Sequence, residues 1–388
     1  MNMSFVVPVK ESLKMEYQLP PPPITTPNLV PHQVPVGVMQ GTLNHIQTVQ
    51  DDNNRWTQYH QLWRQHVYMN VSTMSVYMKV IGNDSKLGKI LNRDFLGERS
   101  RYIEVGTEKI MLPGKFEEYY ERIKDFEVRD DDVYILAFPK TGSRWVQEMV
   151  WLLLNNLDFK KACEVSLDLR SPLLELEAIF ENLVGDFHYF DAVVNLESPR
   201  CIRSHLIWPL LPTAISNGTK QPKIIVILRD PEDICTSYYY QAKGIEGYSG
   251  NWNDFCELFL GGKVPFGPFW KHVLSFWEQR HRPNIMFVSY KKMKADLIGN
   301  IRNVASFLGK KLSEEDVIRM HEHLTFDNLK KSEGFNMEHL IKIKKVDVNP
   351  FIRTGVVGGH KNVMSPEVIE AFKQQREHYL TGTDLTFD

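Results

Sequence analysis

The residues with the clearest chemical potential form a short turn, Pro-Lys-Thr-Gly-Ser-Arg-Trp, at positions 139–145. The apolar run 133–138 predicts a buried strand before the turn, and apolar residues at helical spacing over 145–154 predict a helix after it. The N-terminus of a helix presents unpaired N–H groups and a partial positive charge, which together bind anions. The turn therefore predicts a site for a phosphate or sulfate group.

The side chains of the turn suit the same task. Gly142 lets the backbone approach a ligand, and Lys140 adds a mobile positive charge. Thr141 and Ser143 add hydroxyl donors. The turn is not a Walker A motif, because its lysine precedes the glycine. An ordinary strand-to-helix turn with a surface lysine is the alternative interpretation.

Two further segments carry groups that bind anions. Arg229 follows the β-branched run 223–228, at the strand end where ligands bind in open α/β sheets, and Ser237 lies about two turns into the next helix. The glycine-rich segment 353–359 begins with an arginine and could wrap an anion with backbone N–H groups. Each is weak alone, since Arg229 could instead cap local carbonyls and glycine-rich loops are common.

The elements that must position these residues alternate along the chain. Strands are predicted at 133–138, 200–204, 223–228 and 285–290, and helices at 117–123, 145–154, 231 onward, 295–308, 314–323 and 367–375. Asp230 is predicted as an N-cap, followed by Pro231 at the first helical position. Alternating strands and helices predict a three-layer α/β fold, with a central parallel sheet and helices on both faces.

The N-terminal part differs in composition. Positions 18–50 contain no charged residue and are rich in proline, and positions 51–90 show no clear period. We therefore expect residues 1–94 to form a Pro/Gln-rich, mostly disordered extension and residues 95–388 to form the folded domain.

Composition excludes several classes of protein. The 388 residues carry 46 Lys and Arg against 48 Asp and Glu, so a surface that binds nucleic acid is not expected. The four cysteines match no zinc pattern, and no metal is predicted. Neither a secretory signal nor an apolar run long enough to span a membrane is visible, which indicates a cytoplasmic protein.

Taken together, the motifs resemble those of the cytosolic sulfotransferases, which use 3′-phosphoadenosine 5′-phosphosulfate (PAPS) and release PAP. Residues 140–145 resemble the family's 5′-phosphosulfate loop, and Arg229 with Ser237 matches its 3′-phosphate-binding pair. Residues 351–358 resemble its C-terminal R-K-G-x-x-G segment, and residues 203–205 match a K-T-H stretch. The resemblance covers the chain from about residue 95 and implies the P-loop-like sulfotransferase fold. Residues 307–315 and 383–385 are similar to the insect branch, which includes retinol dehydratase.

The resemblance implies the catalytic roles. His205 would be the general base, since an unperturbed imidazole titrates near pH ~6.5 and is largely neutral in the cytosol, although a lone histidine is often structural. Lys140 would neutralise the charge on the leaving phosphate. Arg203, where the family has lysine, would hold a sulfuryl oxygen. Ser237 would contact the 3′-phosphate and the lysine.

The resemblance also implies a nucleotide site, with Trp145 stacked on the adenine and residues near the ribose and phosphates. Its members are Lys140, Thr141, Gly142, Ser143, Arg144, Trp145, Arg229, Ser237, Tyr290, Thr325, Phe326, Arg353, Thr354 and Gly355. Some positions depart from the family pattern: Arg144 replaces a threonine, Thr354 a lysine, Leu324 a threonine and Gly359-His360 the pair D-W. The extra cation Arg144 could strengthen anion binding or crowd it. A homodimer is expected from the family, but Ser365 and Pro366 alter its dimer motif.

The sequence says less about the acceptor substrate than about the nucleotide site. Phe116, Trp208 and the run Tyr238–Tyr240 are candidates for an aromatic acceptor pocket, and each could equally be core. We expect sulfuryl transfer to a small lipophilic acceptor, such as a phenol, a sterol-like alcohol or an isoprenoid alcohol. The alternatives are a retinol-dehydratase-like reaction through a transient sulfate ester, or an inactive relative that only binds nucleotide or lipid.

Overall fold

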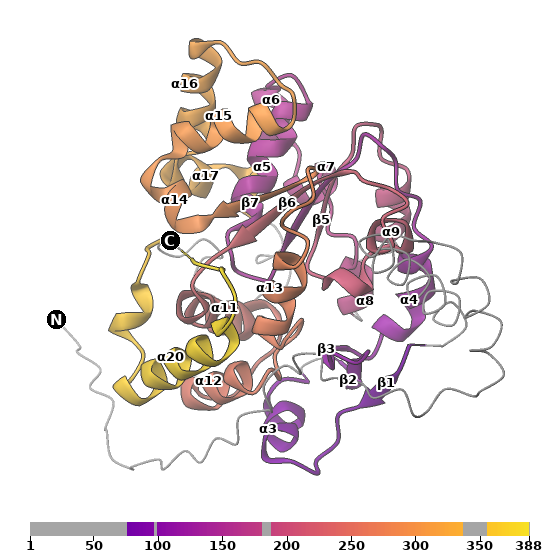
Figure 1. Ribbon diagram of the computed structural model, residues 1–388, viewed down its shortest axis with the longest axis vertical. Helices are drawn as coiled ribbons and strands as arrows, with labels where there is room; N and C mark the ends of the chain where they lie inside the picture. Colours follow the sequence, from indigo (N-terminus) through magenta and orange to yellow (C-terminus); the bar gives the residue numbers. More distant parts are fainter. Residues whose placement is uncertain (1–75, 97–98, 181–187, 337–354, 388) are drawn as a thin grey trace, which may run out of the picture. The chain divides into compact units, whose positions relative to one another are not determined.

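The computed structural model describes residues 76–96, 99–180, 188–336 and 355–387 (Figure 1). Its centre is a four-stranded sheet in the order β5-β4-β6-β7, in which every neighbouring pair is parallel. The strands are β4 (Val133–Ala137), β5 (Cys201–Ser204), β6 (Lys223–Leu228) and β7 (Ile285–Ser289). All four predicted strands are therefore confirmed.

The sheet is buried because helices cover both faces, as predicted (Figure 1). On one face, α5 (Ser143–Leu154) and α15 (Leu297–Phe307) pack an apolar core against the strands, including Val146, Met149, Ile301 and Val304. On the other face, the Phe138 ring packs against rings of α11, α12 and α13. These helices cover Pro231–Ile245, Trp252–Leu260 and Phe269–Trp277. The three-layer arrangement is thus confirmed.

The folded part begins earlier than predicted. Described elements precede Phe95 and belong to the same compact unit as the rest of the described fold. Strand β1 (Met78–Val80) pairs with β2 (Tyr102–Val105), which pairs with β3 (Ile110–Pro113) in an antiparallel sheet. These strands have only three or four residues, so tertiary pairing rather than a sequence period determines them. The rest of the expected disordered extension, residues 1–75, lies outside the described residues.

Helix α3 (Lys86–Asp94) precedes the expected boundary as well. Ion pairs attach it to α12, between Lys86 and Glu257 and between Arg93 and Asp254. The helix was missed because its sequence is mostly polar and its few buried side chains face partners far along the chain.

The other predicted helices are α4 (Phe116–Lys124), α16 (Glu314–His323) and α20 (Pro366–Leu380), and all three are present. Asp230 occupies the N-cap position of α11 as predicted, but its carboxylate makes no capping hydrogen bond and accepts one from Arg376 at 3.2 Å. Short helices that the sequence did not predict are α6 (Phe159–Glu164), α7 (Leu167–Arg170), α8 (Leu176–Ile179), α9 (Tyr189–Val194), α10 (Thr213–Ser216), α14 (Tyr290–Ala295), α17 (Phe326–Lys331), α18 (Glu333–Asn336), η1 (Trp208–Leu210) and η2 (Gly359–Asn362). Among the described residues, no helix is long and apolar enough to cross a membrane.

Candidate functional site

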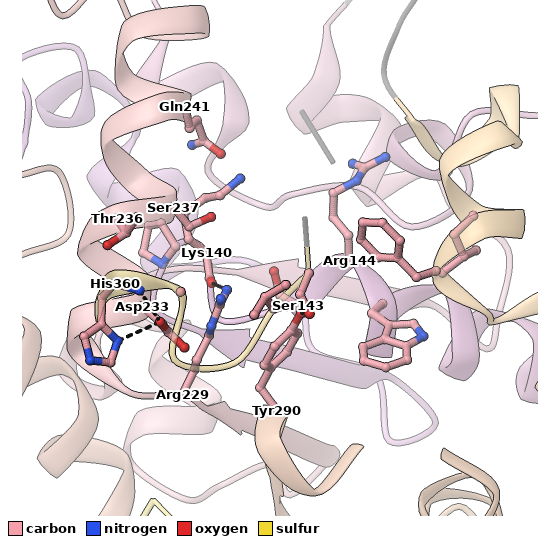
Figure 2. A pocket seen from close by; sticks show the side chains of 18 of the residues that line it. Lys140, Ser143, Arg144, Arg229, Asp233, Thr236, Ser237, Gln241, Tyr290 and His360 are labelled. Atoms are coloured by element: carbon pink, nitrogen blue, oxygen red, sulfur yellow. Dashed lines mark hydrogen bonds and ion pairs between the residues drawn. The ribbon is translucent and has the colours of Figure 1, made fainter. Parts of the chain in front are cut away.

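The carboxyl ends of β4, β5 and β6 open onto one pocket (Figure 2). Most of the predicted site residues line it: Lys140, Gly142, Ser143, Arg144, Trp145, Arg203, His205, Arg229, Ser237, Tyr290, Phe326 and Gly355. Arg353 and Thr354 lie outside the described residues. Segments that are far apart in the sequence therefore converge at the edge of the sheet that was predicted to bind the anion.

The turn after β4 has the backbone that an anion site needs. Gly142 is the N-cap of α5 with φ of 96°, and no side chain caps the helix. A Cβ at this position would lie 2.6 Å from the Tyr290 ring, so glycine is required for both φ and packing. Lys140 also has a positive φ, 70°, which is uncommon for a residue with a side chain.

Four cations line the pocket: Lys140, Arg144, Arg203 and Arg229. Burial, and then the neighbouring Arg229, lower the pKa of Lys140 to about 7. Arg229 donates a hydrogen bond to the Lys140 carbonyl at 2.8 Å, and its guanidinium lies 4.3 Å from the centroid of the Tyr290 ring. Among the described residues that line the pocket, Asp233 is the one carboxylate, so this lining is strongly positive and suits a polyanion.

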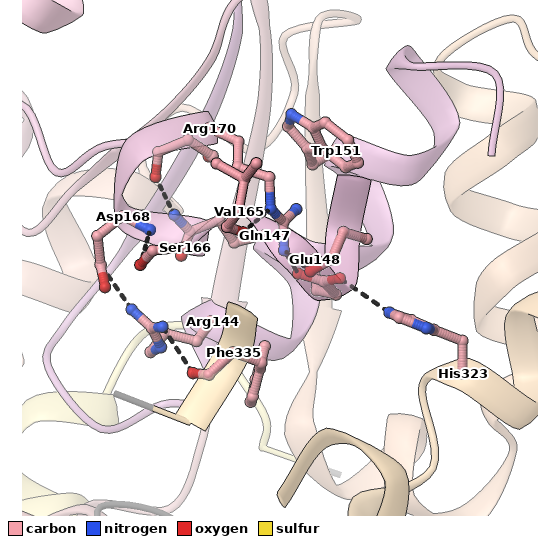
Figure 3. Close-up of polar contacts among 12 residues, drawn as sticks. Arg144, Gln147, Glu148, Trp151, Val165, Ser166, Asp168, Arg170, His323 and Phe335 are labelled. Atoms are coloured by element: carbon pink, nitrogen blue, oxygen red, sulfur yellow. Dashed lines mark hydrogen bonds and ion pairs between the residues drawn. The ribbon is translucent and has the colours of Figure 1, made fainter. Parts of the chain in front are cut away.

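Arg144 does not point its charge at the loop as a simple extra phosphate ligand would. Its guanidinium donates to Asp168 Oδ1 at 2.6 Å and to the Phe335 carbonyl at 2.7 Å (Figure 3). Asp168 also lies 3.6 Å from Arg203 Nη2. The added cation is thus largely compensated by a carboxylate on α7, which the sequence analysis did not single out.

His205 follows β5 directly, and its ring orientation is set by a backbone group. Its Nδ1 lies 2.6 Å from the carbonyl oxygen of Ala137. A carbonyl only accepts, so Nδ1 carries the proton and Nε2 keeps its lone pair. Burial, followed by the charge of Arg203, holds the pKa of His205 well below its usual range. The imidazole is therefore neutral at physiological pH and able to accept a proton.

Two buried side chains hold the backbone of His205. Glu175 Oε1 accepts from the His205 N–H at 2.6 Å, and His272 Nε2 donates to the His205 carbonyl at 2.9 Å. Burial raises the pKa of Glu175 to about 7 and lowers that of His272 to about 4. Neither residue was predicted, since nothing in the sequence shows which side chains surround a strand end.

A clasp between Asp233 and the glycine-rich segment was also missed (Figure 2). The Gly358 N–H donates to Asp233 Oδ2 at 2.7 Å, and His360 Nδ1 lies 2.8 Å from Oδ1. Burial opposes ionisation of Asp233, but the hydrogen bonds from His360 and Gly358 outweigh it and lower its pKa. The unusual Gly359-His360 pair therefore attaches the C-terminal segment to the first turn of α11.

The aromatic side of the pocket comes from three elements. The rings of Trp145 and Tyr290 lie 5.9 Å apart at 68°, and the Trp145 indole N–H donates to the Leu324 carbonyl at 2.9 Å. The Lys294 ammonium lies 5.6 Å from the centroid of the Phe326 ring. Trp145, Tyr290 and Phe326 thus line one pocket together, and their contact with an adenine stays a prediction.

Two predicted nucleotide-binding hydroxyls lie elsewhere. The Thr141 hydroxyl donates to the Phe138 carbonyl at 3.0 Å, inside the turn. The Thr325 hydroxyl donates to the Glu322 carbonyl at 2.9 Å, where α16 ends. Neither residue lines the pocket. Both hydroxyls satisfy carbonyls at the ends of elements, which short polar side chains do readily.

The three predicted acceptor residues do not line this pocket either. Phe116 is fully buried at the start of α4, and Trp208 packs against Phe276. Tyr240 is half-buried on α11, with its ring 5.4 Å from that of Tyr239. Aromatic side chains are common in cores, and the sequence offered no way to separate the two uses. Gln241, one turn after Ser237, does line the pocket (Figure 2).

The family model described as Sulfotransferase domain matches residues 130–384. The chain belongs to the sulfotransferase domain family. Luciferin sulfotransferase of Photinus pyralis is 37% identical over 325 residues, which cover 79% of this chain and 88% of that protein. Sulfotransferase 1E1 of Homo sapiens is 32% identical over 281 residues, covering 72% of this chain and 93% of the other. The similarity to named sulfotransferases therefore extends over most of the chain.

Solved sulfotransferase-fold structures superpose on the same part. Retinol dehydratase in a complex with retinol and PAP has a TM-score of 0.74 at 25% identity, covering 81% of this chain and 99% of that one. Retinol dehydratase with androsterone and PAP has a TM-score of 0.73 at 26% identity, covering 80% and 98%. The P-loop-like sulfotransferase fold predicted from the sequence is confirmed.

Proposed function

We propose that this sulfotransferase moves a sulfuryl group from PAPS to the hydroxyl of a small lipophilic acceptor. The observation that carries the proposal is the pocket itself, in which four cations and a neutral imidazole line one surface at the strand ends. PAP accompanies the retinol dehydratase structures, and PAPS is the corresponding donor.

The lining residues fit such a donor. A nucleotide with a 3′-phosphate and a 5′-phosphosulfate carries several negative charges, and the lining side chains supply Lys140, Arg144, Arg203 and Arg229 against one carboxylate. Glycine at 355 has φ of 60°, and a Cβ there would meet the Phe326 ring at 2.6 Å. The backbone can thus approach a ligand closely beside an aromatic surface.

The positions of the lining residues suggest which part of the donor each would bind. The uncapped first turn of α5 and Lys140 would hold the phosphosulfate, and Arg229 with Ser237 would hold the 3′-phosphate. Trp145, Tyr290 and Phe326 would contact the adenine. When the donor is bound, its phosphate anhydride supplies an activated sulfuryl group, and Lys140 would stabilise the charge that develops on the bridging oxygen.

His205 would take the proton of the acceptor hydroxyl. Its Nδ1–H bond to the Ala137 carbonyl leaves Nε2 as the proton acceptor, and Glu175 and His272 fix the backbone that carries it. The imidazolium that results would face the anionic donor, whose charge would offset the burial that otherwise keeps the His205 ring neutral. Arg203 would bind a sulfuryl oxygen during the same step.

Two side chains near the base bear on the choice of acceptor. The Phe266 ring lies 5.4 Å from the His205 ring, outside the pocket lining, and Gln241 lines the pocket. This favours a small lipophilic alcohol or phenol.

A cytosolic location and a homodimer stay predictions. Ser365 accepts a hydrogen bond from the Val368 N–H at 3.4 Å, and Pro366 begins α20, so the altered positions of the dimer motif form the start of a helix.

The test is transfer of label from PAPS to a panel of phenols, sterols and isoprenoid alcohols, with the products identified by mass spectrometry. Sulfate esters would support the proposal. Retinol that returns as a dehydrated hydrocarbon with free sulfate would instead support the dehydratase reaction. Calorimetric binding of PAP without transfer to any acceptor would show an inactive nucleotide binder and contradict the proposal.

A further inference from the structure

Asp168 lies between two arginines of the pocket wall and meets them unequally. Its Oδ1 accepts from Arg144 Nη1 at 2.6 Å, which is a strong charge-assisted hydrogen bond. The same oxygen is 3.6 Å from Arg203 Nη2, which is too long for a hydrogen bond. Arg144 and Arg203 therefore compete for one carboxylate oxygen, and Arg144 holds it.

As a consequence, the Arg203 guanidinium has no hydrogen-bond acceptor among the described residues. Its side chain is 10% exposed and lines the pocket, and its Nε is buried without a hydrogen-bond partner among the described residues. No described residue accepts a hydrogen bond from its Nη atoms either. A buried donor without an acceptor is costly, so an unpaired guanidinium at a pocket wall indicates that a ligand supplies the acceptor.

Arg144 is held in place by more than the carboxylate. It donates to the Phe335 carbonyl at 2.7 Å, and its guanidinium lies 5.4 Å from the centroid of the Phe335 ring. These contacts on α18 keep the fork of Arg144 turned toward Asp168 (Figure 3). The side chains of Arg144 and Asp168 are only 7% and 13% exposed, so the surrounding residues restrict their movement.

We propose that Arg144 and Asp168 form a positioning pair that keeps Arg203 available to bind an oxygen of the transferred sulfuryl group. The inference rests on the proposed function. Without Arg144, Arg203 would be the nearest cation to the carboxylate among the described residues, and a movement of about 1 Å would create a full ion pair at hydrogen-bond length. Arg203 would then be drawn from the sulfuryl end of the site. Arg144, Asp168 and Arg203 thus work as one unit, in which Arg144 acts through Arg203 and is not itself a ligand of the reacting group.

The test is a double-mutant cycle read as the ratio of the affinities for PAPS and PAP, which differ only by the sulfuryl group. Calorimetry without acceptor should show that Arg144→Thr lowers the ratio about tenfold, since Arg203 is captured. Arg144→Thr with Asp168→Asn should recover most of the ratio, because the amide no longer attracts Arg203. Arg144→Lys should stay near the wild-type value, since the charge that occupies Asp168 is kept.

A purely structural role predicts the opposite pattern. The double variant would then be as impaired as Arg144→Thr or worse, and that result would overturn the proposal, as would a ratio unchanged in Arg144→Thr. The exposed pair Arg302 and Glu314 provides the matched control, in which Arg302→Thr and Glu314→Gln should leave the ratio unchanged. If Arg144→Thr does not fold, Arg144→Met alone and with Asp168→Asn makes the same comparison.

Failure of this inference is distinguishable from failure of the proposed function. A wild-type protein that transfers sulfuryl to no acceptor contradicts the function, while the affinity ratio still reports on Arg203. A wild-type protein that transfers, with no recovery in the double variant, contradicts only the positioning pair.

Discussion

Helix α5 carries two ion-pair clusters one turn apart, and they are built differently (Figure 3). In the rear cluster, Arg170 donates to Glu148 at 2.6 Å and to the carbonyls of Val165 and Ala162, while His323 contacts the other carboxylate oxygen of Glu148 at 2.9 Å. The side chains of Arg170 and Glu148 are 1% and 0% exposed.

In the front cluster, Asp168 forms a short ion pair with Arg144 at 2.6 Å, while its distance to Arg203 is 3.6 Å. The rear cluster satisfies its carboxylate and joins α5 to α7 and α16, whereas the front cluster leaves donors facing a pocket. Loss of one partner from a compensated buried ion pair destabilises the fold, because the other charge stays buried, whereas charges left incompletely compensated at a pocket are available to a ligand. Changes near the pocket should therefore alter catalysis, and changes at the rear should alter stability.

The largest effect is expected for His205→Ala. Loss of the general base should lower the transfer rate by a factor of about 10²–10⁴ while PAP affinity stays near the wild-type value. The measurement is kcat with labelled PAPS together with calorimetry for PAP. Alanine at the exposed His281 is the control and should not change the rate. A rate near wild type in His205→Ala would show that the base is misassigned.

Glu148→Gln should break the rear cluster. Removing one partner of a buried ion pair typically costs about 3–5 kcal/mol, because the Arg170 charge stays buried without compensation. Urea unfolding measures the loss, and kcat of the folded protein should not change. Glu164→Gln removes an exposed contact with Lys160 at 4.0 Å and should cost under about 1 kcal/mol. An equal loss of unfolding free energy in Glu148→Gln and Glu164→Gln would show that the rear cluster does not stabilise the fold.

Lys140 should link nucleotide binding to pH. Its pKa of about 7 in the empty pocket leaves it mostly neutral at pH 8, and bound anions would raise that pKa. Binding of PAP should therefore take up a proton at pH 8, and affinity should fall up to about tenfold per unit as pH rises above 7. Calorimetry in two buffers of different ionisation enthalpy measures the uptake.

Lysine-to-methionine variants supply the comparison for this pH effect. Lys140→Met should abolish the proton uptake. Lys124, whose pKa burial lowers to about 8, bonds the carbonyls of Pro209 and Leu211 and does not line the pocket. Lys124→Met should keep the uptake, and uptake that persists in Lys140→Met would contradict the assignment.

The smallest effect is expected at the clasp. His360→Ala removes one of the contacts with Asp233 while the backbone bond from Gly358 stays, so PAP affinity should fall only about three- to tenfold, the value of one charge-assisted hydrogen bond. Lys361→Ala, an exposed change in the same segment, is the control. No difference between the two variants would show that the clasp does not support nucleotide binding.

The strands of the sheet, the turn at 139–145 and most of the cations of the pocket could be predicted from the sequence. Strands β4 and β6 are uninterrupted apolar runs, and such runs are identifiable because both faces of a parallel strand are buried. Lys140 and Arg229 come shortly after β4 and β6, and His205 directly follows β5, so the topology of a parallel sheet predicts that they meet at one edge.

The partners of those groups depend on the three-dimensional fold and could not be predicted from the sequence. The counter-ion of Arg144, the carbonyl that sets the His205 tautomer and the clasp on Asp233 join residues from separate elements, and no local period marks such contacts. The strand and helix before Phe95 and the burial of Phe116 and Trp208 also depend on contacts between distant parts of the chain. Backbone patterns follow from neighbours along the chain, whereas charge compensation and aromatic burial depend on which distant surfaces meet.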